Sequence, residues 1–432
     1  MSPGPSRFRW FVVSLLFIAT TINYIDRQIL ALLKPILDQE LGWTNEEFGW
    51  VNSAFFGVYA ASYVVFGWFI DRVGVKRGFT VSIVWWSLAA IAHALVGSVR
   101  GFFCARVALG AGEGGNFPAC IKAVAIWFPK RERALASSLF TAGASVGPIL
   151  APALVPWIAL NFGWRAAFVL AGAAGFLWLA LWLPFFKNTP RESPLVSPGE
   201  RELIESDRDP RSDSDRPVSW PGLFALRQTW SIVLAKFLTD PIAWFFLIWL
   251  PDFFKKTRGM DIKGSWLHLV TIYSIAAAFS VAGGWLSGHL IGRGWSITKG
   301  RKTVMLICSL AVTPVLLVSQ VGDWTAVVII GFALAAHHAW SSTIYASTSD
   351  MFPKSAIAAV SGIAGMSGAL GGGMMFPVIA GKLLDHFKDT AAGESAGYAI
   401  LFVVCGSAYV VALAISHCLA PRFEQIDFER RP

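Results

Sequence analysis

Long apolar stretches dominate this chain and limit its possible folds more than any other feature. A helix of about 20 apolar residues is long enough to cross the hydrocarbon core of a bilayer. Twelve stretches of suitable length occur along the 432 residues, at approximately 10–34, 48–70, 79–99, 101–127, 135–160, 165–186, 230–254, 266–291, 303–320, 325–350, 356–384 and 396–419. The sequence therefore predicts an all-α integral membrane protein with twelve transmembrane helices.

The composition supports a membrane protein and argues against several other classes. Charged residues make up 15% of the chain, against roughly a quarter in soluble domains. The net charge of +9 is compatible with nucleic-acid binding, but the basic residues lie in short loops between apolar stretches. We therefore expect a lipid bilayer and no nucleic acid as partner. The five cysteines and seven histidines show no ligand spacing, so we expect no metal and no cofactor.

The distribution of Lys and Arg between successive loops predicts the orientation of the helices, because cytoplasmic loops carry an excess of these residues. The loops rich in basic residues lie near 72–77, 130–133, 293–302 and 354. The opposite set begins with an acidic stretch at 38–47 and continues with small loops around Arg100, Gly163 and Asp323, and the basic residues at 255–258 are an exception. Residues 1–10 lack a small-residue cleavage site, so we expect the first apolar stretch to be retained. Both termini are predicted to be cytoplasmic.

A long polar stretch separates the sixth and seventh spans. It runs from Lys187 to Arg227, mixes Pro, Ser, Asp, Glu and Arg, and is predicted to bury no core. We interpret residues 187–229 as a cytoplasmic linker between an N-terminal half, 1–186, and a C-terminal half, 230–432.

The two halves echo each other in sequence. A Trp-Phe-Pro-Lys run at 127–130 follows the fourth span, and a Met-Phe-Pro-Lys run at 351–354 follows the tenth. Each run precedes a helix with a glycine-rich segment, at 143–147 and 365–368. Parallel repeats with a site at the midplane between them are a known plan of transporters. We therefore expect two six-helix bundles around a central cavity.

A glycine- and charge-rich run ends the second span: Gly67-Trp-Phe-Ile-Asp71-Arg72-Val-Gly74-Val-Lys-Arg. Taken alone, it predicts a tight glycine turn whose cations hold the helix end in the cytoplasm. It also resembles the loop signature of the major facilitator superfamily, in which this cluster latches the halves in the outward-facing state. The resemblance implies a latch role for Gly67, Asp71, Arg72 and Gly74. The corresponding run at 284–293 lacks the Asp-Arg pair, so its latch should be weaker or different.

Within that superfamily, the chain is most similar to the anion:cation symporter family over essentially its whole length. The stretches that carry this resemblance lie at 23–27, 106–118, 122–133, 163–165, 236–241 and 249–251. Runs at 46–52 and 85–90 look most like the hexuronate branch. The resemblance implies proton-coupled symport of a hexuronate or related sugar acid across the inner membrane of a bacterium. We expect the transporter to be a monomer.

Four positions depart from the hexuronate branch. Thr141, Ser145 and Thr343 stand where the resemblance implies Asn, and His338 stands where it implies Gln. They lie in segments expected to line the cavity, so the identity of the sugar acid stays open. The alternative hypothesis is a transporter of another organic anion: an aldonate, a dicarboxylate or an aromatic acid.

Charged residues inside the predicted spans indicate where the functional site lies, because each costs at least about 2.5–3.5 kcal/mol on the insertion scale. Arg106 and Glu113 are seven residues apart and therefore share one helix face. Asp26 and Arg27 lie in the first span. One interpretation is purely structural, with ion pairs that tie helices together, although close packing of Gly and Ala would serve that purpose as well.

The functional interpretation gives these four residues different roles. The guanidinium of Arg27 can donate two parallel hydrogen bonds to a carboxylate, which favours it as binder of the substrate anion. Asp26 and Glu113 are the candidate proton carriers, because burial and a neighbouring Arg act oppositely on a carboxyl pKa. We expect Arg106 to pair with Asp26, and Glu113 to have no fixed partner. The family resemblance supports these assignments.

Aromatic and histidine side chains complete the predicted substrate site. Tyr24 and Tyr59 are candidate hydroxyl donors, since the resemblance implies a ligand-contacting Tyr at similar points; ordinary aromatic packing is the alternative. His337 and Trp340 are further candidates on the tenth span. Adjacent residues point about 100° apart on a helix, so at most one of His337 and His338 should face the cavity.

Three other functions agree less well with the sequence. An ion channel would need rings of like charge or a carbonyl filter, whereas the charges here form one asymmetric set. No His-Glu-x-x-His run, serine nucleophile elbow or phosphate-binding loop occurs, so we assign no catalytic residues and expect no enzyme. A sensor would usually carry a soluble output domain, and we identify none.

Overall fold

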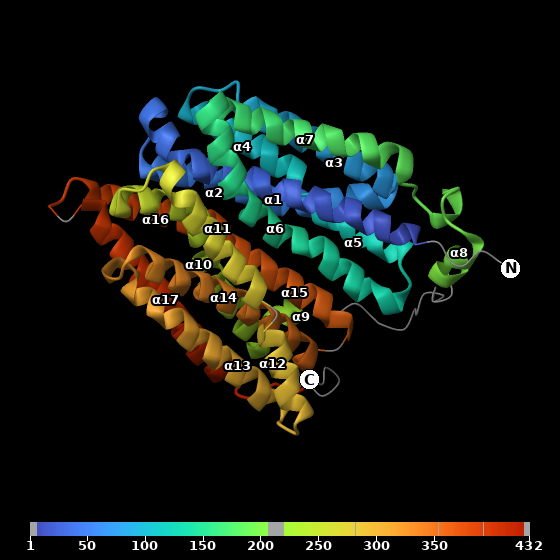
Figure 1. The fold of residues 1–432 in the computed structure, drawn as a ribbon. Helices are drawn as coiled ribbons and strands as arrows, with labels where there is room; N and C mark the ends of the chain where they lie inside the picture. Colours follow the sequence, from blue (N-terminus) through green and yellow to red (C-terminus); the bar gives the residue numbers. More distant parts are fainter. Residues whose placement is uncertain (1–6, 206–219, 281, 353, 392, 427–432) are drawn as a thin grey trace. The chain divides into compact units, whose positions relative to one another are not determined.

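Helices form almost all of the computed structural model, which describes residues 7–205, 220–280, 282–352, 354–391 and 393–426 (Figure 1). Within these ranges no β-strand occurs. The earlier helices are α1 (Phe8–Leu41), α2 (Asn45–Val73), α3 (Val75–His93), α4 (Val99–Glu113), α5 (Asn116–Trp127), α6 (Lys130–Phe162), α7 (Trp164–Phe185), the short η1 (Pro190–Glu192) and α8 (Pro198–Glu205). The later ones are α9 (Trp220–Phe224), α10 (Arg227–Arg258), α11 (Ile262–Phe279), α12 (Ala282–Gly292), α13 (Ile297–Val312), η2 (Thr313–Gln320), α14 (Asp323–Met351), α15 (Lys354–Gly368), the π-helical η3 (Ala369–Met375), α16 (Phe376–Lys388) and α17 (Gly393–Leu419).

Each of the twelve predicted spans coincides with one helix or with consecutive helical segments. In the described part of the chain, nine helical stretches are long and apolar enough to cross a membrane, judged by length and composition. The three other predicted spans are α3 and two interrupted stretches, α4–α5 and α11–α12. The helix is interrupted between α4 and α5 at Gly114 and Gly115, and α11 ends before Ser280. The all-α membrane architecture predicted from the sequence is confirmed.

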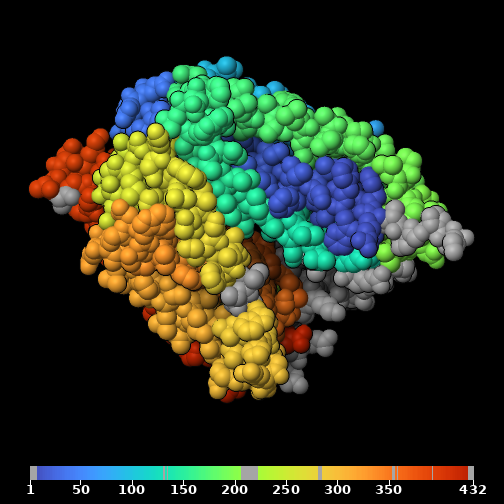
Figure 2. Space-filling model, in the orientation of Figure 1, coloured from blue at the N-terminus to red at the C-terminus, as the bar shows by residue number. Residues whose placement is uncertain are grey.

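The chain divides into two compact units. The first contains Met1–Trp43 and Trp50–Arg211, and the second contains Thr44–Gly49 and Ser212–Pro432. In the first unit α1 packs against α6 and α7, and α3 packs against α4 and α7. Figure 2 shows the side chains of α1 (blue) and α7 (green) next to each other on the surface of this unit. In the second unit α10 packs against α15 and α17, and α14 packs against α11 and α13. The boundaries of the halves at 186 and 230 stay a prediction.

Glycine and small polar residues determine how several helices begin and approach one another. Between α2 and α3, Gly74 has a φ of 85°, a left-handed conformation that glycine adopts without steric cost. Ser98, Asp261 and Ser296 each accept a hydrogen bond from an amide in the first turn of α4, α11 and α13, respectively. Gly110 on α4 lies against the backbone of α2, where any Cβ would collide. This close approach brings α4 next to the predicted site.

Part of the polar stretch after α7 packs into the first unit, a contact that the sequence did not predict. Figure 1 shows α8 near the start of α1. Glu200 on α8 is fully buried and accepts hydrogen bonds from the N–H groups of Phe8 and Arg9, at 3.1 Å each. Its carboxylate also pairs with the Arg9 guanidinium at 2.9 Å. A carboxylate at a helix N-terminus is favourable, and this docking depends on contacts almost 200 residues apart that no local pattern reveals.

Candidate functional site

Arg27 and Glu113 form a buried ion pair in the first unit. Arg27 lies on α1 and Glu113 ends α4, and the guanidinium Nε donates to the carboxylate Oε2 at 2.7 Å. The two side chains are 4% and 0% exposed. Removing either partner would leave an uncompensated buried charge, so the pair fixes both helices. The prediction that Glu113 has no fixed partner is therefore wrong. Spacing shows which residues share a helix face, but it does not show which neighbouring helix reaches that face.

Three aromatic rings surround the guanidinium of Arg27. Its Cζ lies 4.8 Å from the ring centroid of Tyr24 and 4.4 Å from that of Tyr59. The third ring belongs to Phe55, at 5.3 Å. Ring faces attract a cation at these distances, so the rings hold the plane of the guanidinium. Its Nη2 has no hydrogen-bond partner among the described residues. One side of the fork can therefore donate to a further carboxylate.

Tyr24 and Tyr59 were predicted from the sequence, whereas Phe55 was not. Its ring lies between two cations, since the Cζ of Arg106 is 5.6 Å from the same centroid. Phe55 also stacks on Tyr59, with ring centroids 5.8 Å apart. The spacing of four residues between Phe55 and Tyr59 on α2 was the signal available in the sequence.

Asp26, Asn23 and Arg106 form a second buried polar group near the Arg27–Glu113 pair. Each of the three is at most 2% exposed. Both carboxylate oxygens of Asp26, and Nε and Nη2 of Arg106, lack hydrogen-bond partners among the described residues. The expected Asp26–Arg106 ion pair is therefore not formed, and the two charges interact only over a longer distance. Buried polar atoms without partners are rare in proteins, so their concentration here marks this region as a candidate site.

The residues assigned to the latch lie at the end of α2 and the turn that follows. Asp71 is largely exposed and accepts a hydrogen bond from Lys122 Nζ at 2.6 Å. Lys122, on α5, also donates to the carbonyl of Ile70 at 3.1 Å. Arg72 stacks over the ring of Trp68, with its Cζ 4.1 Å from the centroid. Asp71 thus joins α2 to α5 through a lysine, and a latch role stays a prediction.

The second unit has a different arrangement at the corresponding place. Arg301 on α13 pairs with Asp350 on α14 at 2.8 Å and donates to the hydroxyl of Ser287 on α12 at 2.9 Å. An arginine therefore connects three helices there, whereas Asp71 and Lys122 connect two in the first unit.

His337 and Trp340 lie inside the second unit. The Nδ1 of His337 is 2.7 Å from the hydroxyl of Tyr409 on α17. Trp340 is fully buried and packs edge-on against the same ring, with centroids 5.3 Å apart. His338 is the exposed member of the histidine pair. The structure thus engages both predicted substrate residues of α14 with Tyr409, and it leaves His338 as the accessible imidazole.

A buried lysine on α10 forms an ion pair in the second unit. Lys236 Nζ pairs with Asp240 at 2.9 Å and donates to Ser341 Oγ on α14, also at 2.9 Å. It lies 5.1 Å from the ring centroid of Tyr345. The carboxylate of Asp240, one turn away on the same helix, balances the charge of Lys236. The hydrogen bond from Lys236 to Ser341 connects α10 to α14.

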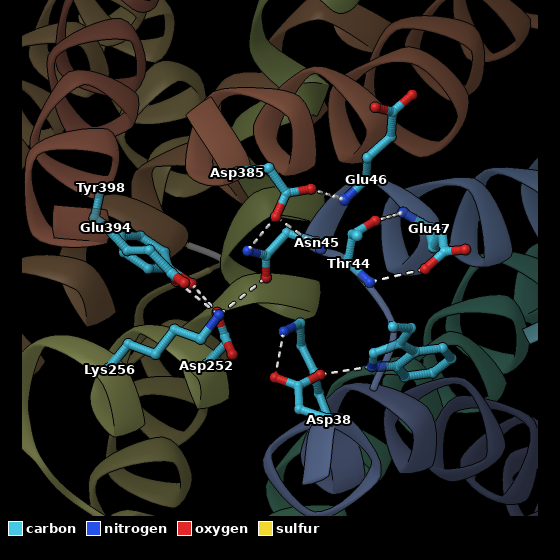
Figure 3. A network of polar contacts seen from close by, with 12 residues as sticks. Asp38, Thr44, Asn45, Glu46, Glu47, Asp252, Lys256, Asp385, Glu394 and Tyr398 are labelled. Carbon is cyan, nitrogen blue, oxygen red and sulfur yellow. Dashed lines mark hydrogen bonds and ion pairs between the residues drawn. The ribbon is translucent and has the colours of Figure 1, made fainter. Parts of the chain in front are cut away.

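A polar network in the second unit holds the start of α2 (Figure 3). Asp385 on α16 accepts hydrogen bonds from the N–H of Asn45 at 3.0 Å, from Asn45 Nδ2 at 2.9 Å and from the N–H of Glu46 at 2.7 Å. Lys256 on α10 donates to Asn45 Oδ1 at 3.0 Å and pairs with Glu394 at 2.6 Å. The exposed N–H groups at a helix start favour a carboxylate. The sequence did not predict this network, which joins Asn45 to residues more than 200 positions away.

Comparison with known proteins identifies the family. The model of the Major Facilitator Superfamily matches residues 16–376. The chain belongs to the Major Facilitator Superfamily. This major facilitator protein is therefore a multi-pass membrane transporter and not an enzyme. Among the residues that the structure describes, no group of three His, Cys, Asp or Glu side chains is arranged to hold a metal.

Two relatives and one solved structure are similar to this major facilitator protein. The hexuronate transporter of Escherichia coli (strain K12) is 30% identical over 386 residues, which cover 87% of this chain and 88% of the relative. The galacturonate transporter of Dickeya chrysanthemi is 33% identical over 258 residues, covering 59% and 74%. A bacterial homolog of the human lysosomal transporter Spinster, in an inward-facing and occupied conformation, matches with a TM-score of 0.76 at 19% identity, covering 97% and 98%. The resemblance stated from the sequence is confirmed.

Proposed function

We propose that this major facilitator protein is a proton-coupled symporter of an organic anion, a hexuronate or related sugar acid, that works by alternating access. The observation that carries the proposal is the buried Arg27–Glu113 pair within its aromatic rings. A substrate carboxylate and the Glu113 carboxylate would be alternative partners of one guanidinium. The names of two relatives, a hexuronate and a galacturonate transporter, support the substrate class.

Arg27 binds the substrate carboxylate in this proposal. Its unpartnered Nη2 provides the first donor, and release of Glu113 frees Nε as the second. Tyr24 and Tyr59 flank the guanidinium, so their hydroxyl groups can donate to oxygens of the sugar ring. His337 and Trp340, on α14 of the second unit, are further proposed substrate contacts, and both side chains lie against Tyr409.

Glu113 carries a coupling proton in this proposal. When substrate occupies Arg27, Glu113 loses its partner, and a buried carboxylate without a partner is stabilised by taking up a proton. Asp26 is the second proton carrier, since it is buried close to Arg106 without forming a contact pair. Two titratable groups beside one substrate-binding Arg favour transport of more than one proton per anion.

Another organic anion is the second candidate substrate: an aldonate, a dicarboxylate or an aromatic acid. Two of the positions that depart from the hexuronate branch, Thr141 and His338, are exposed, and Ser145 is half-buried.

Uptake of radiolabelled glucuronate into proteoliposomes, driven by an inward proton gradient, tests the proposed function. Unlabelled glucuronate and galacturonate should inhibit this uptake more strongly than a panel of other acids that contains galactonate, glucarate and benzoate. Stronger competition by a panel member would favour the alternative, and gradient-independent uptake would contradict proton coupling.

The proposed topology places both termini in the bacterial cytoplasm and joins two six-helix bundles, 1–186 and 230–432, through the linker at 187–229. A thiol introduced by Arg293→Cys should react only from the cytoplasmic side, and one introduced by Ser395→Cys only from outside. Both positions are exposed, so a membrane-impermeant maleimide reaches them. The background should lack Cys104 and Cys418, the two exposed native cysteines. Labelling of both introduced thiols in intact cells would contradict the topology.

The network around Asp385 is the proposed gate of the alternating-access cycle. It fastens Thr44–Gly49 within the second unit, although the rest of α2 belongs to the first. Phe48 adds an edge-on aromatic contact to Trp249 on α10, at 5.2 Å. Asp252 extends the network through Lys256, at 3.4 Å. Loss of these bonds would release the start of α2, which is the kind of local change that alternating access needs.

Asp385→Asn should loosen the start of α2. The amide keeps the size of the carboxylate but loses its charge and one of its two acceptors, and charge-assisted bonds contribute about 1.5–3 kcal/mol. We expect amide hydrogen exchange in the peptide covering Thr44–Gly49 to become at least about tenfold faster. Asp389→Asn removes an exposed carboxylate close by in sequence and should leave that exchange unchanged. Equal exchange in parent and Asp385→Asn would exclude Asp385 as the gate.

A further inference from the structure

Three cations gather in a pocket between the end of α2 and the start of α3. This pocket, of about 820 Å³, is lined by Arg72 from α2 and by Lys76 and Arg77 from α3. Within the described part of the chain, none of the three forms an ion pair. Lys187 lies near enough to Lys76 to add repulsion, which Glu192 offsets only in part. The pocket therefore concentrates positive charge and favours an anionic ligand.

Apolar grooves lead away from the cationic pocket along α3. Val81 lines the cationic pocket and also two neighbouring cavities, of about 440 and 550 Å³. The first groove runs along α2 past Trp68, and the second runs along α3 to Ala92. Trp85 lines both. From Val81 to Ala92 the helix rises about 16 Å, which is about half of the ~30 Å hydrocarbon core and so matches one leaflet.

The joined shape distinguishes this site from a surface patch of basic residues. Positive charge lies at one end only, where Arg72 lies in the last turn of α2 and Lys76 and Arg77 lie in the first turn of α3. The grooves that continue from it are lined almost wholly by apolar side chains, and Val81 and Trp85 are 43% and 51% exposed there. A ligand that fills the whole site needs an anionic group next to long apolar chains.

We propose that the pocket and its two grooves bind an anionic phospholipid, with the phosphate on Arg72, Lys76 and Arg77 and the acyl chains in the grooves beside α3. Basic pockets between membrane helices are a recognised form of anionic headgroup site. A zwitterionic lipid brings its own cation into the pocket and binds more weakly. A free phosphate fills only the cationic end.

The test compares lipid binding by the purified full chain and two double variants. Lys76→Gln/Arg77→Gln removes two cations of the pocket. Arg293→Gln/Lys299→Gln removes two exposed cations from the second unit, one of which also stacks on a tryptophan, at 4.4 Å. Titration with dioleoyl phosphatidylglycerol in detergent, read by native mass spectrometry, gives the dissociation constant. The pocket variant should bind about 10- to 30-fold more weakly, and the control within about twofold of the parent.

Three further arms identify the ligand. Dioleoyl phosphatidylcholine has the same chains without net charge and should bind at least about tenfold more weakly. Glycerol 3-phosphate lacks the chains and should not displace the phosphatidylglycerol at hundredfold excess. Val81→Trp fills the point where the three cavities meet and should weaken phosphatidylglycerol binding without removing a charge. If the double variant does not elute as a folded protein, Val81→Trp tests the same proposal. Displacement by glycerol 3-phosphate, equal binding of the two lipids, or equal loss in both double variants overturns the proposal.

Discussion

Replacing Arg27 by Lys should weaken the binding of glucuronate by about one to two decades. The guanidinium donates to Glu113 through Nε and keeps Nη2 without a partner, between the rings of Tyr24 and Tyr59. The ammonium of a lysine keeps the charge, but it is not planar. It can neither present two parallel donors to one carboxylate nor lie flat against the aromatic rings as a guanidinium does. Charge-assisted hydrogen bonds contribute about 1.5–3 kcal/mol each, and every 1.4 kcal/mol is a factor of ten.

Counterflow of radiolabelled glucuronate in proteoliposomes measures this loss as an increase in the half-saturating concentration. Arg165→Lys is a matched control, because Arg165 also pairs with a carboxylate, Glu40 at 3.1 Å, and stacks on an aromatic ring, Trp164 at 4.2 Å. Its side chain is 52% exposed, so the same substitution there should change the half-saturating concentration by less than about twofold. An unchanged value in Arg27→Lys would remove Arg27 from the substrate site.

The sequence predicts the helices well because the length of an apolar run is a local property. Their ends are less predictable. The first span was expected to end near residue 34, yet α1 continues to Leu41. Lys34 is buried and pairs with Asp38 one turn later, at 2.7 Å, so the helix continues through a polar turn until Gly42 ends it with a φ of 63°. Hydropathy alone does not report such pairing.

The site was predictable in its residue types but not in its pairing. Arg106 and Glu113 were correctly placed on one face of α4 by their spacing, but the partner of Glu113 comes from α1, 86 residues away. Which face of α1 meets α4 depends on the rotation of both helices, and that rotation is set by packing of the whole unit. The same reason explains why His337 and not His338 contacts Tyr409. Adjacent positions differ by about 100° around the helix axis. The periodicity of the sequence gives this difference, but it does not show which position faces a given neighbouring helix.

Replacing Glu113 by Gln should separate exchange of substrate from its accumulation, the largest functional effect expected of any single substitution here. Gln has the size of a protonated Glu and can still accept a hydrogen bond from Arg27. The guanidinium then keeps its charge without a competing anion, so substrate binding should persist. Exchange needs only the loaded carrier to change its conformation, and this step requires no proton release from Glu113.

Accumulation of substrate, unlike exchange, requires coupling to the proton gradient. A sugar acid is already ionised at neutral pH, so uptake against an inside-negative potential needs accompanying protons. One proton per monoanion makes transport electroneutral, and two make it electrogenic. Glu113 in the parent would take up a proton when it leaves Arg27, but Gln at this position cannot bind or release a proton. A pH gradient can therefore no longer drive accumulation of substrate through this residue. We expect counterflow within about threefold of the parent and gradient-driven accumulation close to zero.

Both quantities should be measured on the same proteoliposomes. Glu200→Gln is a suitable control because Glu200 is equally buried and also pairs with an arginine, Arg9 at 2.9 Å, at the start of α1. It should retain accumulation, because the site of the substrate is unaltered. Asp26→Asn tests the second proposed carrier and should reduce accumulation without the same loss of pairing, since Asp26 forms no contact ion pair with Arg106 in the structure. If Glu113→Gln accumulates glucuronate as well as the parent, Glu113 does not carry the coupling proton, and Asp26 alone must account for coupling.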